Sequence, residues 1–483
     1  MTTNRKYQVL FLVVFLVSVL LRLGLTLVNR QANDHHMAVV VLILKTHKLP
    51  LWQDCGECIQ PKLYHYTAAM VIQALGLAQA NTSTLWLVGQ LVNFVAGTLT
   101  VIIAWIFIKK LPFKNDLLKL LAFALTALNP ALIGINSQAT NDTFVILFST
   151  LALYFAYLFF QKQKIWTFVL VVLFSELGIV SKPNGWVTAI AIFLILTARA
   201  ILNKPQFKQG MLYAAAFLLL VPILTILNPL SQYVVNYQHY GMPVPLTRRR
   251  VPLPYLAKYT PGCEPQNINP KNVYCRPGIL SVKSGFFTFD YISLLEHPRN
   301  EGVSEGYPIF RTSFWTFMYA GAHSIHFLNF PDAWSTTGTE GFTIARGIFV
   351  LALLPTILIL FGLGMEVYLF LKGVFRHDQA LIQITSHGLL ACSFIGYLLF
   401  VAIYTFMYRD FSFMKAIFAF PALLTFPYLF LRAAEPLYAF LSKRMRWSTY
   451  ILDACMVGLL VFYILDAGTL VAQIYLHAYP FHI

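Results

Sequence analysis

Long apolar runs dominate this sequence and constrain its fold more than any other feature. A helix needs about 20 apolar residues to cross the core of a bilayer. We identify about 11 runs of that kind, at 9–28, 85–108, 117–136, 143–160, 165–181, 185–201, 211–228, 346–371, 387–408, 412–431 and 450–473. Charged residues make up only 11% of the 483 positions, against about 25% in soluble domains. The sequence therefore predicts an all-α polytopic membrane protein.

The basic residues of the connecting segments predict how the chain is oriented. Cytoplasmic connections are enriched in Lys and Arg. With the N-terminus inside, these residues gather in inner connections such as "IKKLPFKND", "FQKQK" and "RAAEPLYAFLSKRMR", and are scarce in outer ones such as "INSQATND". The long segments 29–84 and 229–345 then both lie outside. The first run follows Arg5 and Lys6, is longer than a secretory h-region and lacks a clear cleavage site, so we expect a retained signal anchor.

Three regions follow from this layout. A transmembrane core, 1–228, contains the first outer loop, 29–84, whose two short helical patterns suit the membrane interface. An extracytoplasmic region, 229–345, lies between the seventh and eighth spanning helices, and irregular loops of that length are usually functional. The segment 346–483 holds the remaining helices. The net charge of +16 reflects the topology, and no recognition module for nucleic acid is visible.

The six cysteines form three pairs: Cys55 and Cys58, Cys263 and Cys275, and Cys392 and Cys455. The last pair lies inside apolar runs, where cysteine suits packing. The middle pair lies in the long outer loop and could form a disulfide if that compartment is oxidising. The first pair stands in "DCGEC". Because no second pair or histidine stands at zinc spacing, we favour a disulfide or free thiols there over a metal site.

Polar residues from distant parts of the sequence fall on the predicted outer face. They are Asp34, His35 and His36 after the first run, Lys62 in the first outer loop, Asn141 and Asp142 before the fourth run, Lys182 in "SKPNG" and Arg409 in "YRDFSFMKA". Charges near lipid are costly unless they are hydrated, paired or used. Each also has a structural explanation, because Asn and Asp cap helices and lysines reach from apolar surfaces toward water.

Together, these residues suit chemistry on a lipid-linked phosphate. A carboxylate can accept the proton of an acceptor hydroxyl as its oxygen attacks a sugar carbon. Lysine or arginine can neutralise the charge that builds on a departing phosphate. A transporter or flippase of lipid-linked sugars, the alternative class, would instead place polar groups near the bilayer midplane. Arg22 is the nearest to an intramembrane charge, and it lies toward the outer end of its run.

Several stretches resemble a known enzyme group. "NDHHMAVVVLILKTHKLP" followed by "CIQPKLYHYTAAMVIQALG" resembles the first outer loop of bacterial polytopic glycosyltransferases with the GT-C fold, related to protein O-mannosyltransferases and the lipid A aminoarabinose transferase. "ALNPALIGINSQATNDTFVILFSTLALYF" resembles the second acidic motif of that group, and "ELGIVSKPNGWV" resembles its "GLALLTK" turn. The resemblance covers roughly residues 1–230 and rests on layout beyond them.

The resemblance implies roles for the matching residues. Asp34 corresponds to the catalytic acid of the first loop, the general base. Asp142 corresponds to the acid of the second motif, a second catalytic residue that would position the acceptor or orient groups of the donor. Lys182 corresponds to a lysine that could bind the donor phosphate, and Arg409 to an arginine near the last outer turn. The predicted substrate-binding residues are His35, His36, Gln60, Tyr64 and Asn141.

Two positions depart from the pattern of the group. Gln60, Pro61, Leu63 and Tyr64 match a "QPPLYY"-like element, but Lys62 replaces its second proline and His65 its second tyrosine. Lys62 could add a phosphate contact or mark a divergent acceptor site.

The resemblance thus implies an inverting glycosyltransferase in a bacterial plasma membrane, with its active site facing outside. The donor would be a sugar linked to a polyprenyl phosphate, and the acceptor a protein, a lipid or a glycan. No cofactor follows from the sequence with certainty. Asp34 with one neighbouring histidine could ligate a divalent metal ion, but adjacent residues on a helix point in different directions, so the metal stays open.

Overall fold

The computed structural model describes residues 5–29, 35–241, 286–296, 298, 313–324, 339–376, 381–408 and 415–478. Four residues that carry predictions, Asp34, Arg409, Cys263 and Cys275, lie outside the described residues. Within the described ranges, every regular element is a helix. The predicted all-α class is therefore confirmed.

The spanning helices follow the apolar runs. Among the described residues, eight stretches of helix are long and apolar enough to cross a membrane. They are α1 (Arg5–Val28), α4 (Thr82–Lys110), α7 (Asp142–Lys162), α9 (Gly185–Leu202), α10 (Phe207–Leu227), α17 with α18 (Thr339–Leu351 and Leu353–Arg376), α19 (Leu381–Tyr408) and α21 (Arg446–Ala478). The apolar helix α8 (Ile165–Ser181) is shorter, with 17 residues.

Two of the predicted runs form bent helix pairs. The run 117–136 is divided into α5 (Asp116–Ala127) and α6 (Pro130–Asn136), which meet at 45°. The break falls at Asn129, whose side chain accepts a hydrogen bond from the backbone N–H of Leu132, and a proline suits the first position of the new helix. Counting each bent pair as one span gives up to ten candidate spans among the described residues. The described residues of each predicted run are helical apart from short breaks, and the number of 11 spans stays a prediction.

The run 412–431 differs most from its prediction as a straight span. A 3-10 helix, η6 (Ala416–Ala422), turns by 78° into α20 (Thr425–Arg444). Most of "RAAEPLYAFLSKRMR", predicted as an inner loop, therefore continues a helix. Tertiary contacts stabilise it, because Arg432 of α20 and His387 of α19 both pair with the fully buried carboxylate of Glu366 in α18. A local pattern could not reveal this three-helix ion cluster.

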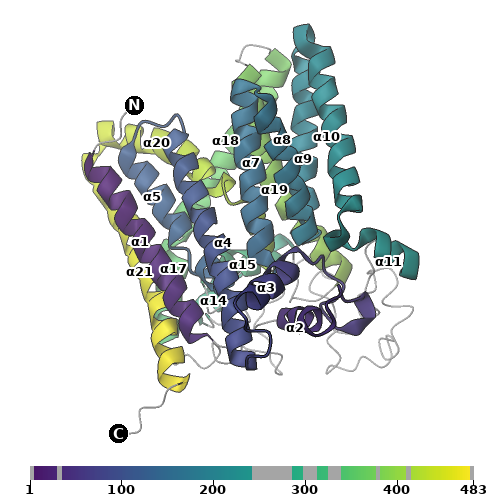
Figure 1. The fold of residues 1–483 in the computed structure, drawn as a ribbon. Coiled ribbons are helices and arrows are strands. Elements are labelled where there is room, and N and C mark those ends of the chain that lie inside the picture. Colours follow the sequence, from purple (N-terminus) through teal and green to yellow (C-terminus); the bar gives the residue numbers. More distant parts are fainter. Residues whose placement is uncertain are drawn as a thin grey trace, which may run out of the picture.

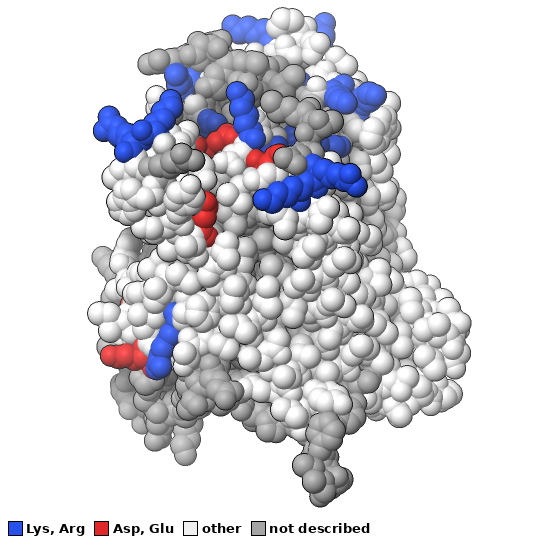
Figure 2. Space-filling model, turned by 90° about the vertical axis from the view of Figure 1, so that its left-hand side faces the viewer, with Lys and Arg blue, Asp and Glu red and all other residues white. Residues whose placement is uncertain are grey.

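The helices form a bundle whose ends differ in charge. In Figure 1, α1 begins and α20 lies at the upper end, while α21 ends at the lower end. Figure 2 shows that most Lys and Arg on its face gather near the upper end. This distribution is the one that an inside N-terminus requires.

Two surface helices lie at the lower end, across the direction of the spanning helices (Figure 1). They are α2 (His36–Thr46) and α3 (Leu63–Ala74), and both are too short to span. Their inner faces form one apolar cluster with α4, in which Val40, Ala68 and Val88 are buried. Burying each such side chain contributes about 1.5–3 kcal/mol for the larger residues, so the pair is fixed firmly against the bundle.

Shorter elements complete the described chain. They are η1 (Trp52–Asp54), η2 (Lys204–Gln206), η3 (Pro229–Ser231), α11 (Tyr233–Tyr240), α14 (Tyr291–Glu296) and α15 (Phe314–His323).

Candidate functional site

An ion pair joins two of the predicted site residues across 40 positions of sequence. The Nζ of Lys182 lies 2.5 Å from Oδ1 of Asp142. The second oxygen, Oδ2, accepts a hydrogen bond of 3.1 Å from the hydroxyl of Thr140. The Lys182 side chain is 14% exposed and the Asp142 side chain 6%. The ammonium also lies 4.8 Å from the ring centroid of Phe418 in η6, so the pair is largely enclosed and the lysine is its more exposed member.

The loop before α7 is held in place by neighbouring polar side chains. The amide of Asn93 in α4 donates hydrogen bonds of 2.6 Å to the carbonyls of Gln138 and Thr140. Asn141 donates through Nδ2 to the carbonyl of Ser181 at 3.2 Å. That last bond joins the start of α7 to the end of α8. The Asn141 side chain therefore ties the loop that carries Asp142 to the segment that carries Lys182.

The turn that presents Lys182 depends on a close approach of α8 and α9. A Cβ added at Gly185 would lie 2.5 Å from the carbonyl carbon of Gly178. Real Cβ atoms do not come that close to backbone, so only glycine allows this hairpin without a shift. "SKPNG" thus positions its lysine through backbone packing, in addition to exposing it at a turn.

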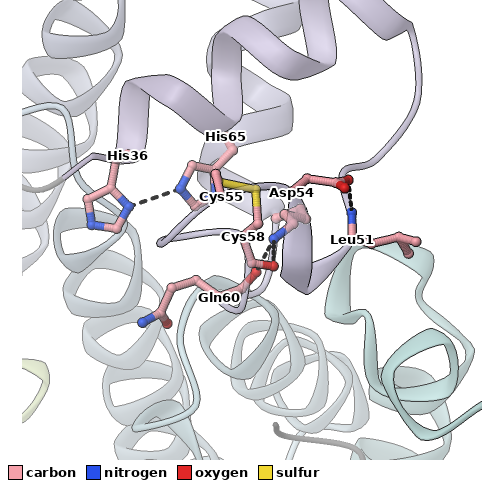
Figure 3. Close-up of a disulfide and its surroundings, with 8 residues drawn as sticks. His36, Leu51, Asp54, Cys55, Cys58, Gln60 and His65 are labelled. Carbon is pink, nitrogen blue, oxygen red and sulfur yellow. Dashed lines mark hydrogen bonds between the residues drawn. A yellow bond between two sulfur atoms is a disulfide. The ribbon is translucent and has the colours of Figure 1, made fainter. Parts of the chain in front are cut away.

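A buried histidine pair lies on the two surface helices. Nδ1 of His36 and Nε2 of His65 are 3.0 Å apart, as Figure 3 shows. Burial lowers the pKa of His65 well below its usual value, and the charges of His36, Lys62 and Lys182 lower it further. His65 is therefore neutral at neutral pH, and one ring donates the shared proton. His35 instead is exposed, so the two adjacent histidines have different environments.

Lys62 faces its own loop. Its Nζ donates to the carbonyls of Cys58 at 2.6 Å and Gln60 at 2.7 Å, and the side chain is fully buried. Burial lowers the pKa of Lys62 to about 7, although the charges of Glu57 and Asp54 oppose the shift. The predicted phosphate contact of Lys62 stays a prediction, and the geometry favours a role in fixing the loop. Gln60, also predicted to bind substrate, is half-buried.

Tyr64 anchors α3 to α4. Its hydroxyl donates to the carbonyl of Gly89 at 3.2 Å, and its ring meets Phe144 edge-on at 5.4 Å. A Cβ at Gly89 would lie 2.7 Å from the Sδ of Met37. The fully buried tyrosine therefore holds the surface helices close to the bundle.

Cys55 and Cys58 form a disulfide in the loop before α3 (Figure 3). Of the two predicted alternatives, disulfide or free thiols, the structure thus has the first. Within the described residues, no group of three or more His, Cys, Asp or Glu side chains is placed to hold a metal ion. Cys392 and Cys455 are free and partly buried.

Sequence reasoning missed several residues that shape the site. Thr140, Asn93 and Phe418 contact the Asp142–Lys182 pair or its loop. Asn93 carried a signal, because it is a polar residue within an apolar run. The fully buried Arg22 donates through Nε to Oδ1 of Asn136 at 3.0 Å and through Nη1 to the carbonyl of Ala127. It thus stabilises the α5–α6 break that precedes the site.

An apolar cavity of about 400 Å³ lies next to this site. It is lined by residues of α5, α6, α15, α18, α19, η6, α20 and α21. Ala416, Ala419 and Phe420 of η6 line it, whereas Phe418 of the same segment lies under the Lys182 ammonium. One short helix therefore separates a large apolar space from the ion pair.

The comparisons agree with the predicted resemblance. Residues 63–227 match the family described as dolichyl-phosphate-mannose-protein mannosyltransferase. The matched segment contains Tyr64, Asp142 and Lys182. The helical membrane architecture and this match confirm the predicted resemblance to membrane glycosyltransferases of the GT-C group. More particularly, about a third of the chain is similar to the protein mannosyltransferases. No curated protein matches the sequence.

Two enzymes are among the solved structures that align with this chain at low identity. The first is the archaeal oligosaccharyltransferase AglB from Archaeoglobus fulgidus in complex with an inhibitory peptide and a dolichol-phosphate, at 12% identity and a TM-score of 0.48, covering 96% of this chain and 56% of that one. The second is ArnT from Cupriavidus metallidurans bound to undecaprenyl phosphate, at 12% identity and a TM-score of 0.34, covering 87% of this chain and 78% of that one. The chain thus spans little more than half the length of the oligosaccharyltransferase.

Proposed function

We propose that this protein transfers a sugar from a polyprenyl-phosphate-linked donor to an acceptor on the extracytoplasmic side of the membrane. The observation that carries the proposal is the enclosed Asp142–Lys182 pair, inside the segment that matches the mannosyltransferase family. The ion pair lies close to the surface helices. Lys182 follows the end of α8, which contacts α3, and the charge of Lys182 acts on His65 in α3.

Lys182 is the proposed ligand of the donor phosphate. Its ammonium is held by Asp142 at 2.5 Å and is partly exposed. A bound phosphate would add a second anionic partner to this preorganised cation, and the cation would stabilise the charge that develops as the phosphate leaves. Asp142, with its other oxygen occupied by Thr140, would position the lysine. Arg409 is proposed as a further phosphate ligand on the resemblance alone.

Asp34 is the proposed general base. The acceptor oxygen would attack the anomeric carbon while Asp34 takes its proton. The bond from that carbon to the phosphate oxygen breaks, and the electron pair leaves with the polyprenyl phosphate. Attack from the face opposite the leaving group inverts the configuration. His36, which stands two positions after Asp34 in the sequence, would be held by His65 next to the reacting groups.

The apolar cavity is proposed to hold part of the hydrocarbon tail of the donor. Its volume is about 400 Å³, and an apolar cavity of about 150 Å³ is enough to bind benzene. Burying a tail there would place its phosphate across η6, where Phe418 lies under Lys182.

A lipid-trapping experiment tests the proposal. The wild type and Asp34→Asn are purified in native lipid discs, and their bound lipids are identified by mass spectrometry. We expect Asp34→Asn to retain a polyprenyl-phosphate sugar that the wild type releases as free polyprenyl phosphate. A folded Asp34→Asn protein that still transfers sugar at the wild-type rate would contradict the assigned base. Lys182→Met, which lacks the proposed phosphate ligand, is the matched variant. We expect it to co-purify without the polyprenyl-phosphate sugar.

A further inference from the structure

The Cys55–Cys58 disulfide combines an accessible sulfur with a buried one. Cys55 is partly exposed, whereas Cys58 is 2% exposed and belongs to the apolar cluster of the surface helices. Cys55, which packs at the edge of the same cluster, is therefore the more exposed cysteine of the bond, and we take its Sγ as the sulfur that an external thiolate attacks. Thiol–disulfide exchange depends on which sulfur can be attacked and on how well the other one leaves.

The leaving group in such an exchange would be the Cys58 thiolate, and the backbone of this residue contacts a lysine side chain. Lys62 follows four positions later, directly before α3, and its Nζ donates to the Cys58 carbonyl. When Lys62 is protonated, its positive charge beside the Cys58 backbone stabilises a thiolate on this residue. The acids of the loop act in the opposite direction, but Asp54 is occupied by a hydrogen bond of 2.7 Å from the backbone N–H of Leu51.

The same disulfide fixes the segment that opens α3. Cys58 supplies one of the two carbonyls that hold the Lys62 ammonium. The backbone N–H of Lys62 donates to the carbonyl of Leu230 in η3 at 2.7 Å, and the N–H of Tyr66 donates to the carbonyl of Lys62 at 2.8 Å. Opening the disulfide would release the carbonyl of Cys58, then the Lys62 side chain, and with it the turn that carries His65.

We propose that Cys55 and Cys58 form a dithiol–disulfide exchange site that controls the order of residues 55–66. The reactant is a dithiol. One of its thiolates attacks Sγ of Cys55, the S–S bond breaks, and the electron pair goes to Sγ of Cys58, which takes a proton. The second thiol of the reactant then displaces Cys55 from the mixed disulfide. Two electrons and two protons pass to the cysteines, and the reactant leaves as its own disulfide.

The first test uses dithiothreitol on the full-length protein in native lipid discs. Free thiols are blocked with N-ethylmaleimide, reductant is added without denaturant, and newly exposed thiols are labelled with iodoacetamide and located by mass spectrometry. We expect Cys55 and Cys58 to be labelled while the protein remains folded. Reduction only after unfolding would overturn the proposal.

Two single variants test the predicted asymmetry. Cys58→Ser leaves the accessible thiol of Cys55, and Cys55→Ser leaves the buried thiol of Cys58. With 5,5′-dithiobis(2-nitrobenzoic acid) as the probe, Cys58→Ser should react faster by about tenfold or more, since access limits the rate. Equal rates would refute the assignment of Cys55 as the attacked sulfur.

Hydrogen exchange tests the coupling without any assay of sugar transfer. Removing the cross-link of this four-residue loop should raise the local opening constant about 20-fold by loop entropy alone. We therefore expect faster exchange at the amides of Lys62 and Tyr66 after reduction, and in the double variant Cys55→Ser/Cys58→Ser without reductant. Unchanged exchange at both amides would show that the disulfide does not control this segment.

Discussion

Removing the charges of Asp142 and Lys182 one at a time should destabilise the protein more than removing both. Lys182→Met leaves the Asp142 carboxylate in an environment where it is only 6% exposed. Breaking a buried pair by removing one partner costs about 3–5 kcal/mol, because an uncompensated charge stays buried. The hydroxyl of Thr140 still bonds to Oδ2 of Asp142, so we expect a value at the lower end, about 3 kcal/mol. Asp142→Asn should cost a similar amount, because it leaves the Lys182 ammonium without its carboxylate partner.

The double variant Asp142→Asn/Lys182→Met separates stability from function. Replacing both charges of a buried pair by neutral groups is often nearly neutral for stability. We expect its free energy of unfolding to lie within about 1 kcal/mol of the wild type, which implies a strong coupling in the double-variant cycle. If Lys182 binds the donor phosphate, the double variant should remain inactive although it is stable.

The assay is reversible unfolding in mixed micelles, with transfer measured on the same preparations. Lys162→Met, at the end of α7 distant in sequence from the turn, is the matched control for loss of a lysine charge. Single variants as stable as the wild type would refute the claim that the pair is buried and coupled. A double variant that transfers sugar normally would refute the phosphate role of Lys182.

Three further predictions follow from the surface helices and the α8–α9 turn. Burial holds the pKa of His65 well below the usual histidine value of about 6.5. The unfolded state therefore binds more protons than the folded state as pH falls below about 6.5, and the free energy of unfolding should decrease there by up to about 1.4 kcal/mol per pH unit. His65→Gln should show a shallower decrease in unfolding experiments between about pH 7 and pH 5, and an identical slope would contradict the assignment. Gly185→Ala should displace Lys182 by forcing α8 and α9 apart, and it should lower the free energy of unfolding by about 1–3 kcal/mol, as overpacking does. Gly468→Ala is the control, because a Cβ at Gly468 meets open space. Equal stability of the two variants would argue against the close hairpin. Gly89→Ala should loosen α3 by pushing against Met37 and Tyr64, detected as faster limited proteolysis of residues 35–80, and unchanged cleavage would count against this packing.

The sequence predicted the membrane architecture well for a clear physical reason. A spanning helix must satisfy its own backbone hydrogen bonds and match the bilayer with its apolar length, and both requirements are local. Each predicted apolar run is therefore helical in the described chain. The two bends were not predicted. Asn129 and Pro130 lie at the break between α5 and α6, and α20, which follows the bend after η6, is held by the pairing of Arg432 with Glu366 of α18.

The candidate site was only partly predictable. Asp142 and Lys182 stood out as polar residues on one face, but their direct pairing, the support of Asn93 and the ring of Phe418 depend on segments far apart in the chain. The roles assigned to Asp34 and Arg409 remain predictions, because both residues lie outside the described part of the chain.

What the sequence determined by itself is the class of protein: a chain of apolar helices with basic residues at one end, because length and charge are properties of each segment alone. What only the tertiary structure decided is which polar groups meet. His36 pairs with His65, Lys62 turns into the loop closed by Cys55 and Cys58, and Lys182 reaches Asp142. Such contacts join residues whose separation in sequence carries no signal, and they form because packing of the apolar faces buries these polar groups close together, where hydrogen bonding is favoured.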